Sequence, residues 1–272
     1  MRLNNYFIKF TNNLAYLDLK ESADYELLND LPLPIYVSDM QSGILTGQMA
    51  DKIDVENFLQ GMLINIGADP EFIHNEEYKS IIAHYIPDVS KYTASTSLNI
   101  ADEDIDKALL LLRAGYLLNP LDNYNAYLYA RFLWPRAYEV EDKFKEDFIR
   151  ESLEILQGIL NKDSNFAIAY YELGNIYANL GEYIKARNYY NNALQKTDTD
   201  EACNEIRDRL SEINDNAEIE EALYFIGKGN YNEAIIKLTG LLSNKKRADA
   251  YYYLGVAYQN IEQYDNSIMA FE

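Results

Sequence analysis

Residues 167–198 read AIAYYELGNIYANLGEYIKARNYYNNALQKTD, and this stretch decides the fold. Its apolar residues recur at helical spacing on both sides of Gly181, which predicts two helices joined by a tight turn. We expect the helices to cross closely at Gly174 and Ala186, because a larger side chain at either position would push them apart. Gly181 suits the turn, since helices often end on a residue with a positive φ. One such pair cannot bury its apolar face, so the stretch predicts further pairs on both sides.

The stretch resembles one tetratricopeptide repeat, a helix–turn–helix unit of about 34 residues. Aromatic, leucine and small residues stand at the family's positions in both helices, and Asp198 replaces the usual closing Pro. The matching positions are Tyr170 (where the family has Trp), Leu173, Gly174, Tyr177, Ala186, Tyr190 and Ala193. The resemblance implies an all-α fold, a TPR-type α-α solenoid in which helix–turn–helix repeats form a right-handed superhelix. It also implies a protein that holds other proteins.

Partial copies of the pattern precede and follow this unit. They cover residues 104–120, 125–134 with 146–160, 222–238 and 251–271. We expect residues 135–143 to be an insertion, because Pro135 would end the preceding helix after Trp134. The last copy stops within its second helix. This truncation suggests a fragment of a longer protein, or an open end that docks on another copy of the chain.

The spacing of the copies predicts a division within the array. Ala167 and Ala248 start equivalent copies, and the interval between them exceeds two units of about 34 residues. The extra residues, 201–214, have the pattern of an amphipathic, capping-like helix. We therefore predict one array over 101–214 and further repeats over 215–272, with a seam near residues 214–216. The alternative is one continuous superhelix that contains an extra helix.

Residues 1–100 match no motif, and we predict a mainly helical N-terminal region. Residues 54–67 read as a helix with Asp54 as its N-cap and Gly67 as its stop. Residues 69–86 read as a second helix with Pro70 in its first turn. Residues 4–17 are expected to be helical, with a strand over 6–10 as the alternative. Residues 31–35 cannot continue a helix, and residues 38–47 resemble a turn.

Composition narrows the functional classes. The net charge of −20 opposes binding to nucleic acid or to an anionic membrane, because both depend on clusters of Lys and Arg. No apolar run is long enough to insert into a membrane, and no signal peptide is evident. The single cysteine, Cys203, fits a reducing compartment, so we expect a cytoplasmic protein. His74 and His84 are spaced too widely for a metal pair on one helix turn. We predict no catalytic residue, metal or cofactor, and therefore no enzymatic activity.

The resemblance also indicates which residues would bind a partner, since the first helix of each repeat lines the concave face in this family. The residues so placed are Tyr127, Arg131, Tyr171, Asn175, Tyr252 and Gln259. Aromatic rings with amides and one Arg suit a peptide held by apolar contacts and hydrogen bonds to its backbone. We predict a scaffold or adaptor that binds a protein or peptide segment in this groove. Two alternatives are a peptide-responsive regulatory module of a longer protein and a self-assembling solenoid that forms homo-oligomers through its open C-terminal end.

Overall fold

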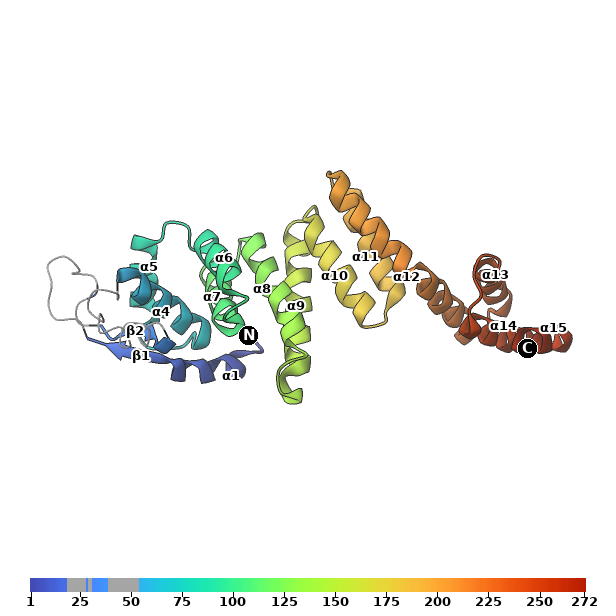
Figure 1. Cartoon of the computed structure of the whole chain (residues 1–272), viewed down its shortest axis with the longest axis horizontal. Helices are drawn as coiled ribbons and strands as arrows, with labels where there is room; N and C mark the ends of the chain where they lie inside the picture. The colour runs from blue at the N-terminus through green and yellow to red at the C-terminus, as the bar shows by residue number, and fades with distance from the viewer. Residues whose placement is uncertain (19–27, 29–30, 39–53) are drawn as a thin grey trace. The chain divides into compact units, whose positions relative to one another are not determined.

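The computed structural model describes residues 1–18, 28, 31–38 and 54–272 (Figure 1). Of the turn predicted over 38–47, only Ser38 lies within the described residues. The chain forms two compact units, the first over residues 1–159 and the second over residues 160–272.

The first unit begins with short elements in place of the predicted helix over 4–17. They are α1 (Asn4–Phe7), the 3-10 helix η1 (Ile8–Asn13) and strand β1 (Leu14–Leu17). Strand β1 pairs antiparallel with β2 (Leu33–Tyr36), from Leu14 opposite Tyr36 to Leu17 opposite Leu33. The alternative of a strand over 6–10 is also wrong: the residues buried there are Tyr6, Phe7 and Phe10, which is a helical spacing. The prediction of one helix over 4–17 is wrong because residues 14–17 form a strand that pairs with β2, outside the predicted segment.

Helix α4 (Val55–Ala68) confirms the predicted start and corrects the predicted stop. The Asp54 carboxylate accepts a hydrogen bond from the backbone N–H of Asn57 at 3.2 Å, and the Asn57 side chain accepts one from the backbone N–H of Asp54 at 3.0 Å. This reciprocal pair is a capping box. Gly67 lies inside the helix, where a Cβ would come within 2.2 Å of the Leu110 carbonyl oxygen. Its role is therefore close packing against the chain at Leu110.

The helix predicted over 69–86 is shorter, since α5 covers Asn75–Tyr85. Residues 69–74 form turns, and Pro70 precedes the helix instead of lying in its first turn. The Asp69 carboxylate accepts from the backbone N–H of Glu71, and the Asn75 side chain donates to the Asp69 carbonyl at 2.8 Å. These side-chain bonds close the turns in place of helical bonds. The next helix is α6 (Val89–Ile100), which was not predicted.

The helices expected upstream of the repeat at residues 167–198 are confirmed. They are α7 (Ile105–Leu118), α8 (Asn123–Arg136) and α9 (Asp142–Lys162). Helix α7 packs on both α6 and α8. The expected end after Trp134 is wrong by two residues, because Pro135 lies in the last turn and the backbone N–H of Ala137 still donates to the Leu133 carbonyl. The buried Ser152 hydroxyl of α9 donates to the Ala130 carbonyl of α8 at 2.8 Å, which fixes one helix on the other.

A fully buried arginine joins the start of the chain to the helices of the first unit. The guanidinium of Arg113 donates to the Asn4 side chain of α1 and to the Gly67 carbonyl near the end of α4. It also lies 4.6 Å from the centroid of the Phe7 ring. These hydrogen bonds and the ring face offset part of the cost of removing the charge from water, while the buried Arg113 Nε has no hydrogen-bond partner among the described residues, so breaking the bonds would be costly.

The second unit contains α10 (Ala167–Asn179), α11 (Tyr183–Lys196), α12 (Asp200–Gly227), α13 (Tyr231–Leu242), α14 (Ala248–Asn260) and α15 (Tyr264–Phe271). Each of these helices packs on the next one along the chain. The expected close contact at Gly174 is present: a Cβ there would come within 2.5 Å of the Tyr190 ring. Ala186 and Tyr190 are both buried in the second helix of the pair.

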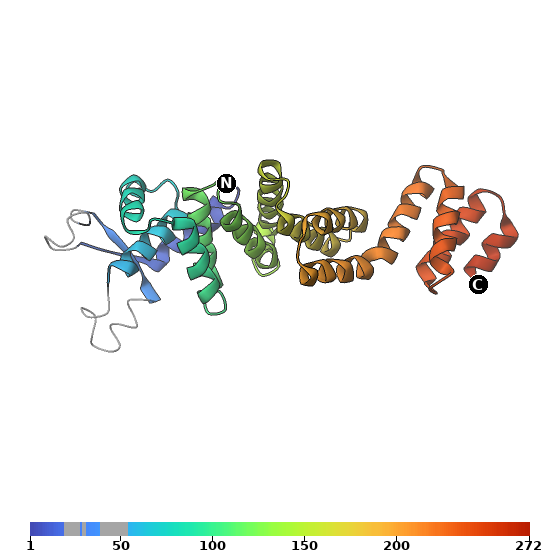
Figure 2. The same ribbon diagram turned by 90° about the horizontal axis from the view of Figure 1, so that it is seen from above.

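The helix expected over 201–214 continues without a break to Gly227, as Figures 1 and 2 both show. The expected seam at residues 214–216 therefore falls inside α12. Asn and Asp are weak helix formers, but neither Gly nor Pro interrupts the chain here. Ile213 and Ala217 are buried on either side of these residues, so packing carries the helix across them.

The turns between paired helices share one backbone feature. Gly181 has a φ of 78° and Gly229 a φ of 77°, which confirms the turn expected at Gly181. The equivalent residue between α14 and α15 is Glu262, with a φ of 61°. Each of the three residues stands two positions before a Tyr that begins the next helix. The last turn therefore places a side chain where glycine is favoured.

Candidate peptide-binding surface

Helix α10 places Tyr171 and Asn175 on one face, because residues four apart are neighbours on a helix surface. The Tyr190 hydroxyl of α11 donates to the side-chain oxygen of Asn175 at 2.7 Å. Tyr190 is only 1% exposed, and its ring lies against Gly174. A buried ring therefore holds the Asn175 amide in place. The bond from Tyr190 orients the amide, whose NH₂ group carries the two hydrogen-bond donors of this side chain.

The first half of α12 brings two charged side chains to the same place. The Tyr171 hydroxyl donates to the Glu205 carboxylate, and Arg209 hydrogen-bonds to Tyr171. Arg209 also donates to Glu212 at 3.1 Å. We call Tyr171, Asn175, Tyr190, Glu205 and Arg209 the polar cluster. It contains side chains from α10, α11 and α12.

The surroundings set the protonation states in this cluster. Burial raises the pKa of the Tyr171 hydroxyl, and its bond to the Glu205 carboxylate raises it further. The bond with Tyr171, followed by the bond with Glu212, raises the pKa of Arg209. Burial likewise raises the pKa of Tyr190. The raised pKa values keep both hydroxyls neutral and Arg209 charged at neutral pH. Together with Glu205, these groups offer donors and acceptors to a peptide backbone or to its polar side chains.

The other predicted residues lie elsewhere. Tyr252 and Gln259 are exposed on α14, where the Tyr252 ring lies 5.9 Å from that of Phe271. In the first unit, Arg131 is exposed on α8, and its guanidinium lies 3.4 Å from the Tyr127 hydroxyl. Tyr127 is only 2% exposed, so its ring packs in the core. Of the six predicted residues, the structure brings Tyr171 and Asn175 into one hydrogen-bonded cluster.

Sequence reasoning missed Glu205 and Arg209, because residues 201–214 were interpreted as a cap. A signal for them was nevertheless present. Glu205 lies 34 residues after Tyr171, and Arg209 lies the same interval after Asn175. That interval is about one repeat, so the first half of α12 occupies the place of the next repeat's first helix. Continuing the repeat period through 201–214 would have identified both residues.

Metal binding and membrane insertion are two further roles to consider for the described residues. Among the described residues, no group of three or more His, Cys, Asp or Glu side chains could hold a metal ion. The His74 ring, just before α5, lies 3.9 Å from the Glu77 carboxylate in the first turn of that helix, an ordinary surface contact. Among the same described residues, no helix is long and apolar enough to cross a membrane.

Comparisons with known proteins give one match of sequence and several of structure. Residues 167–200 match the family model described as tetratricopeptide repeat. No curated protein matches the chain. A solved structure titled "Crystal structure of MamA protein" is 15% identical, with a TM-score of 0.37 over 68% of this chain and 90% of the other. Another, "MamA RS-1 ArsTM double mutant", is 12% identical, with the same TM-score over 68% and 91%.

Proposed function

Because the chain contains a tetratricopeptide repeat within an all-α, TPR-type solenoid, we propose that it is a scaffold that binds a peptide segment of another protein at the polar cluster. Repeats of this kind are in general protein-interaction scaffolds. The observation that supports the finer proposal is the cluster itself, in which α12 supplies Glu205 and Arg209 one repeat after Tyr171 and Asn175.

The proposed contacts follow from the donors and acceptors present. The Asn175 NH₂, held in place by the bond from Tyr190 to the amide oxygen, donates to a carbonyl of the bound backbone. Arg209 and Glu205 exchange their bonds with Tyr171 for bonds to polar groups of the peptide. The binding is non-enzymatic. We further propose a cytoplasmic location, on the grounds of the single Cys203 and the acidic composition.

The test is capture of partners from native lysate by the full chain, with chemical crosslinking. Wild type is compared with Tyr171→Phe/Arg209→Gln, which removes two hydrogen-bonding groups of the cluster. The matched control is Tyr224→Phe/Arg207→Gln, since both residues are exposed on α12 and Arg207 bonds to Asn204 instead of to the cluster. All three proteins must first show the same helical circular dichroism and the same melting.

The expected result is a partner that wild type and control capture and that the cluster variant loses. Peptides that tile this partner should then contain a segment whose affinity falls roughly tenfold in the variant, which corresponds to about 1.4 kcal/mol. Equal capture by all three proteins would place binding away from the cluster. Capture of a second copy of the chain alone would favour self-assembly.

A further inference from the structure

Two apolar clusters in the second unit have only helix α12 in common. The first cluster is buried between α11 and the first half of α12 and consists of Ala186, Tyr190, Ala193, Ile206 and Ile213. The second lies between the rest of α12 and helices α13 to α15 and consists of Ile219, Ala222, Ala234, Leu238, Ala250, Leu254, Ala257 and Ala270. No buried residue belongs to both clusters. Apolar burial therefore holds each group of helices together separately.

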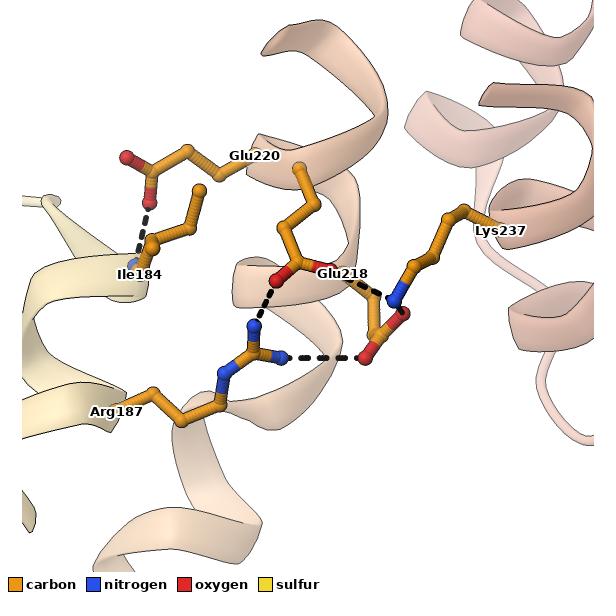
Figure 3. A network of polar contacts seen from close by, with 6 residues as sticks. Ile184, Arg187, Glu218, Glu220 and Lys237 are labelled. Atoms are coloured by element: carbon orange, nitrogen blue, oxygen red, sulfur yellow. Dashed lines mark hydrogen bonds and ion pairs between the residues drawn. The ribbon is translucent and has the colours of Figure 1, made fainter. Parts of the chain in front are cut away.

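Charged side chains occupy the place where the two clusters meet. On α12, Glu218 lies between Arg187 of α11 and Lys237 of α13 (Figure 3). Arg187 and Lys237 each lie 3.2 Å from Glu218, and Lys237 lies 2.7 Å from Glu221. Arg187 also contacts Glu221. Two carboxylates of one helix are thus shared by cations from the two helices on either side.

The location and balance of these charges make them more than ordinary surface pairs. The side chains of Arg187, Glu218 and Glu221 are only 17–25% exposed. Because two cations alternate with two carboxylates, removing either cation leaves two carboxylates close together with one partner. Glu220 adds a contact of its own, since its carboxylate accepts from the backbone N–H of Ile184 in the first turn of α11 at 2.9 Å. A carboxylate is favoured at that end of a helix.

We propose that Arg187, Glu218, Glu221 and Lys237 form a charge-dependent joint, which holds the α10–α11 pair and the α13–α15 group in one arrangement about α12. Screening or neutralising these charges lets α12 bend between Ile213 and Ile219, so that the two groups move relative to each other while each keeps its own apolar core on α12. This inference does not depend on peptide binding. The second unit then has two conformational states, one fixed by these ion pairs and one in which the two groups of helices move relative to each other.

The test measures the distance between the two groups with spin labels on the full chain. Labels are attached at Asn191→Cys on α11 and Met269→Cys on α15, both of which are exposed. Cys203→Ser removes the native thiol, which is half-buried and bonds to the Thr197 carbonyl, as a Ser hydroxyl also can. Pulsed dipolar spectroscopy then gives the distance distribution at about 0.01 M and about 1 M salt, where the Debye length falls from about 30 to about 3 Å.

The labelled wild type should give a narrow distribution at low salt and a broader one at high salt. Glu218→Gln/Glu221→Gln should be broad at both. The control, Glu201→Gln/Glu233→Gln, removes two exposed carboxylates of the same unit and should behave as wild type. Lys237→Gln tests the joint from α13 alone, and should broaden the distribution with unchanged helical circular dichroism. Identical distributions in wild type and both network variants at low salt would overturn the proposal.

Discussion

The close contact between Gly174 of α10 and the Tyr190 ring allows a test of whether this position requires a residue without a side chain. In Gly174→Ala the added methyl group would come within 2.5 Å of one atom of the Tyr190 ring and 2.6 Å of another. Real Cβ contacts are not this short, so the ring or a helix must move. The ring is 1% exposed, and its hydroxyl is bonded to Asn175, so it has little room to move.

The expected free-energy change follows from two opposing effects. Overpacking a well-packed core costs about 1–3 kcal/mol. Replacing Gly by Ala within a helix stabilises by about 1 kcal/mol. We expect the sum, a loss of about 0–2 kcal/mol in the free energy of unfolding, for Gly174→Ala, with Gly174→Leu lowering that free energy further.

The same substitution at Gly240 is the matched control. Gly240 lies within α13, and an added Cβ there would meet no heavy atom within 4 Å. Gly240→Ala should therefore raise the free energy of unfolding by about 0.5–1 kcal/mol. Urea and thermal unfolding, followed by circular dichroism, measure both variants. If both variants stabilise the chain by similar amounts, the placement of Tyr190 against Gly174 is wrong.

Three further changes test other parts of the structure. Glu262→Gly should stabilise the chain by about 1 kcal/mol, because it removes a side chain from a residue with positive φ. Gly229→Ala should destabilise the chain, because it adds a side chain at a positive φ. Melting temperatures that move in the opposite directions would contradict both predictions. Ser152→Ala should cost about 1 kcal/mol in urea unfolding, since it removes the hydroxyl that donates to the Ala130 carbonyl, while Ser152→Thr at the same site tests whether the hydroxyl suffices. Burial alone would raise the pKa of Glu221, but bonds from Lys237 and Arg187 outweigh it and lower that pKa below 4.5. The stabilising contribution of Glu221 is therefore present above its unfolded-state pKa and is lost as the pH falls through the lower, folded-state pKa. In an acid titration, Glu221→Gln should lose less stability than wild type. Equal losses of stability would contradict the ion pairs proposed for Glu221.

Much of the helical architecture was predictable because its determinants are local. The helix pair at 167–196 follows from apolar spacing, from Gly174 at the crossing and from Gly181 in the turn. Asp54 was identifiable as an N-cap because a capping box involves residues only three apart. In the polar cluster, Tyr171 and Asn175 were identifiable because their spacing within one helix sets which face they share.

Local sequence patterns were therefore sufficient to predict the repeated helix pairs, the turn at Gly181 and the helix face shared by Tyr171 and Asn175. Tertiary structure decided the features that depend on distant residues: the pairing of β1 with β2, the burial of the Tyr127 ring, and the contact of Glu205 with Tyr171. The burial of Ile213 and Ala217 also carries α12 unbroken through residues 214–216, despite the weak helix propensity of these residues. The physical reason is the same in each case: the stabilising partner lies in another element, and only folding brings it into contact.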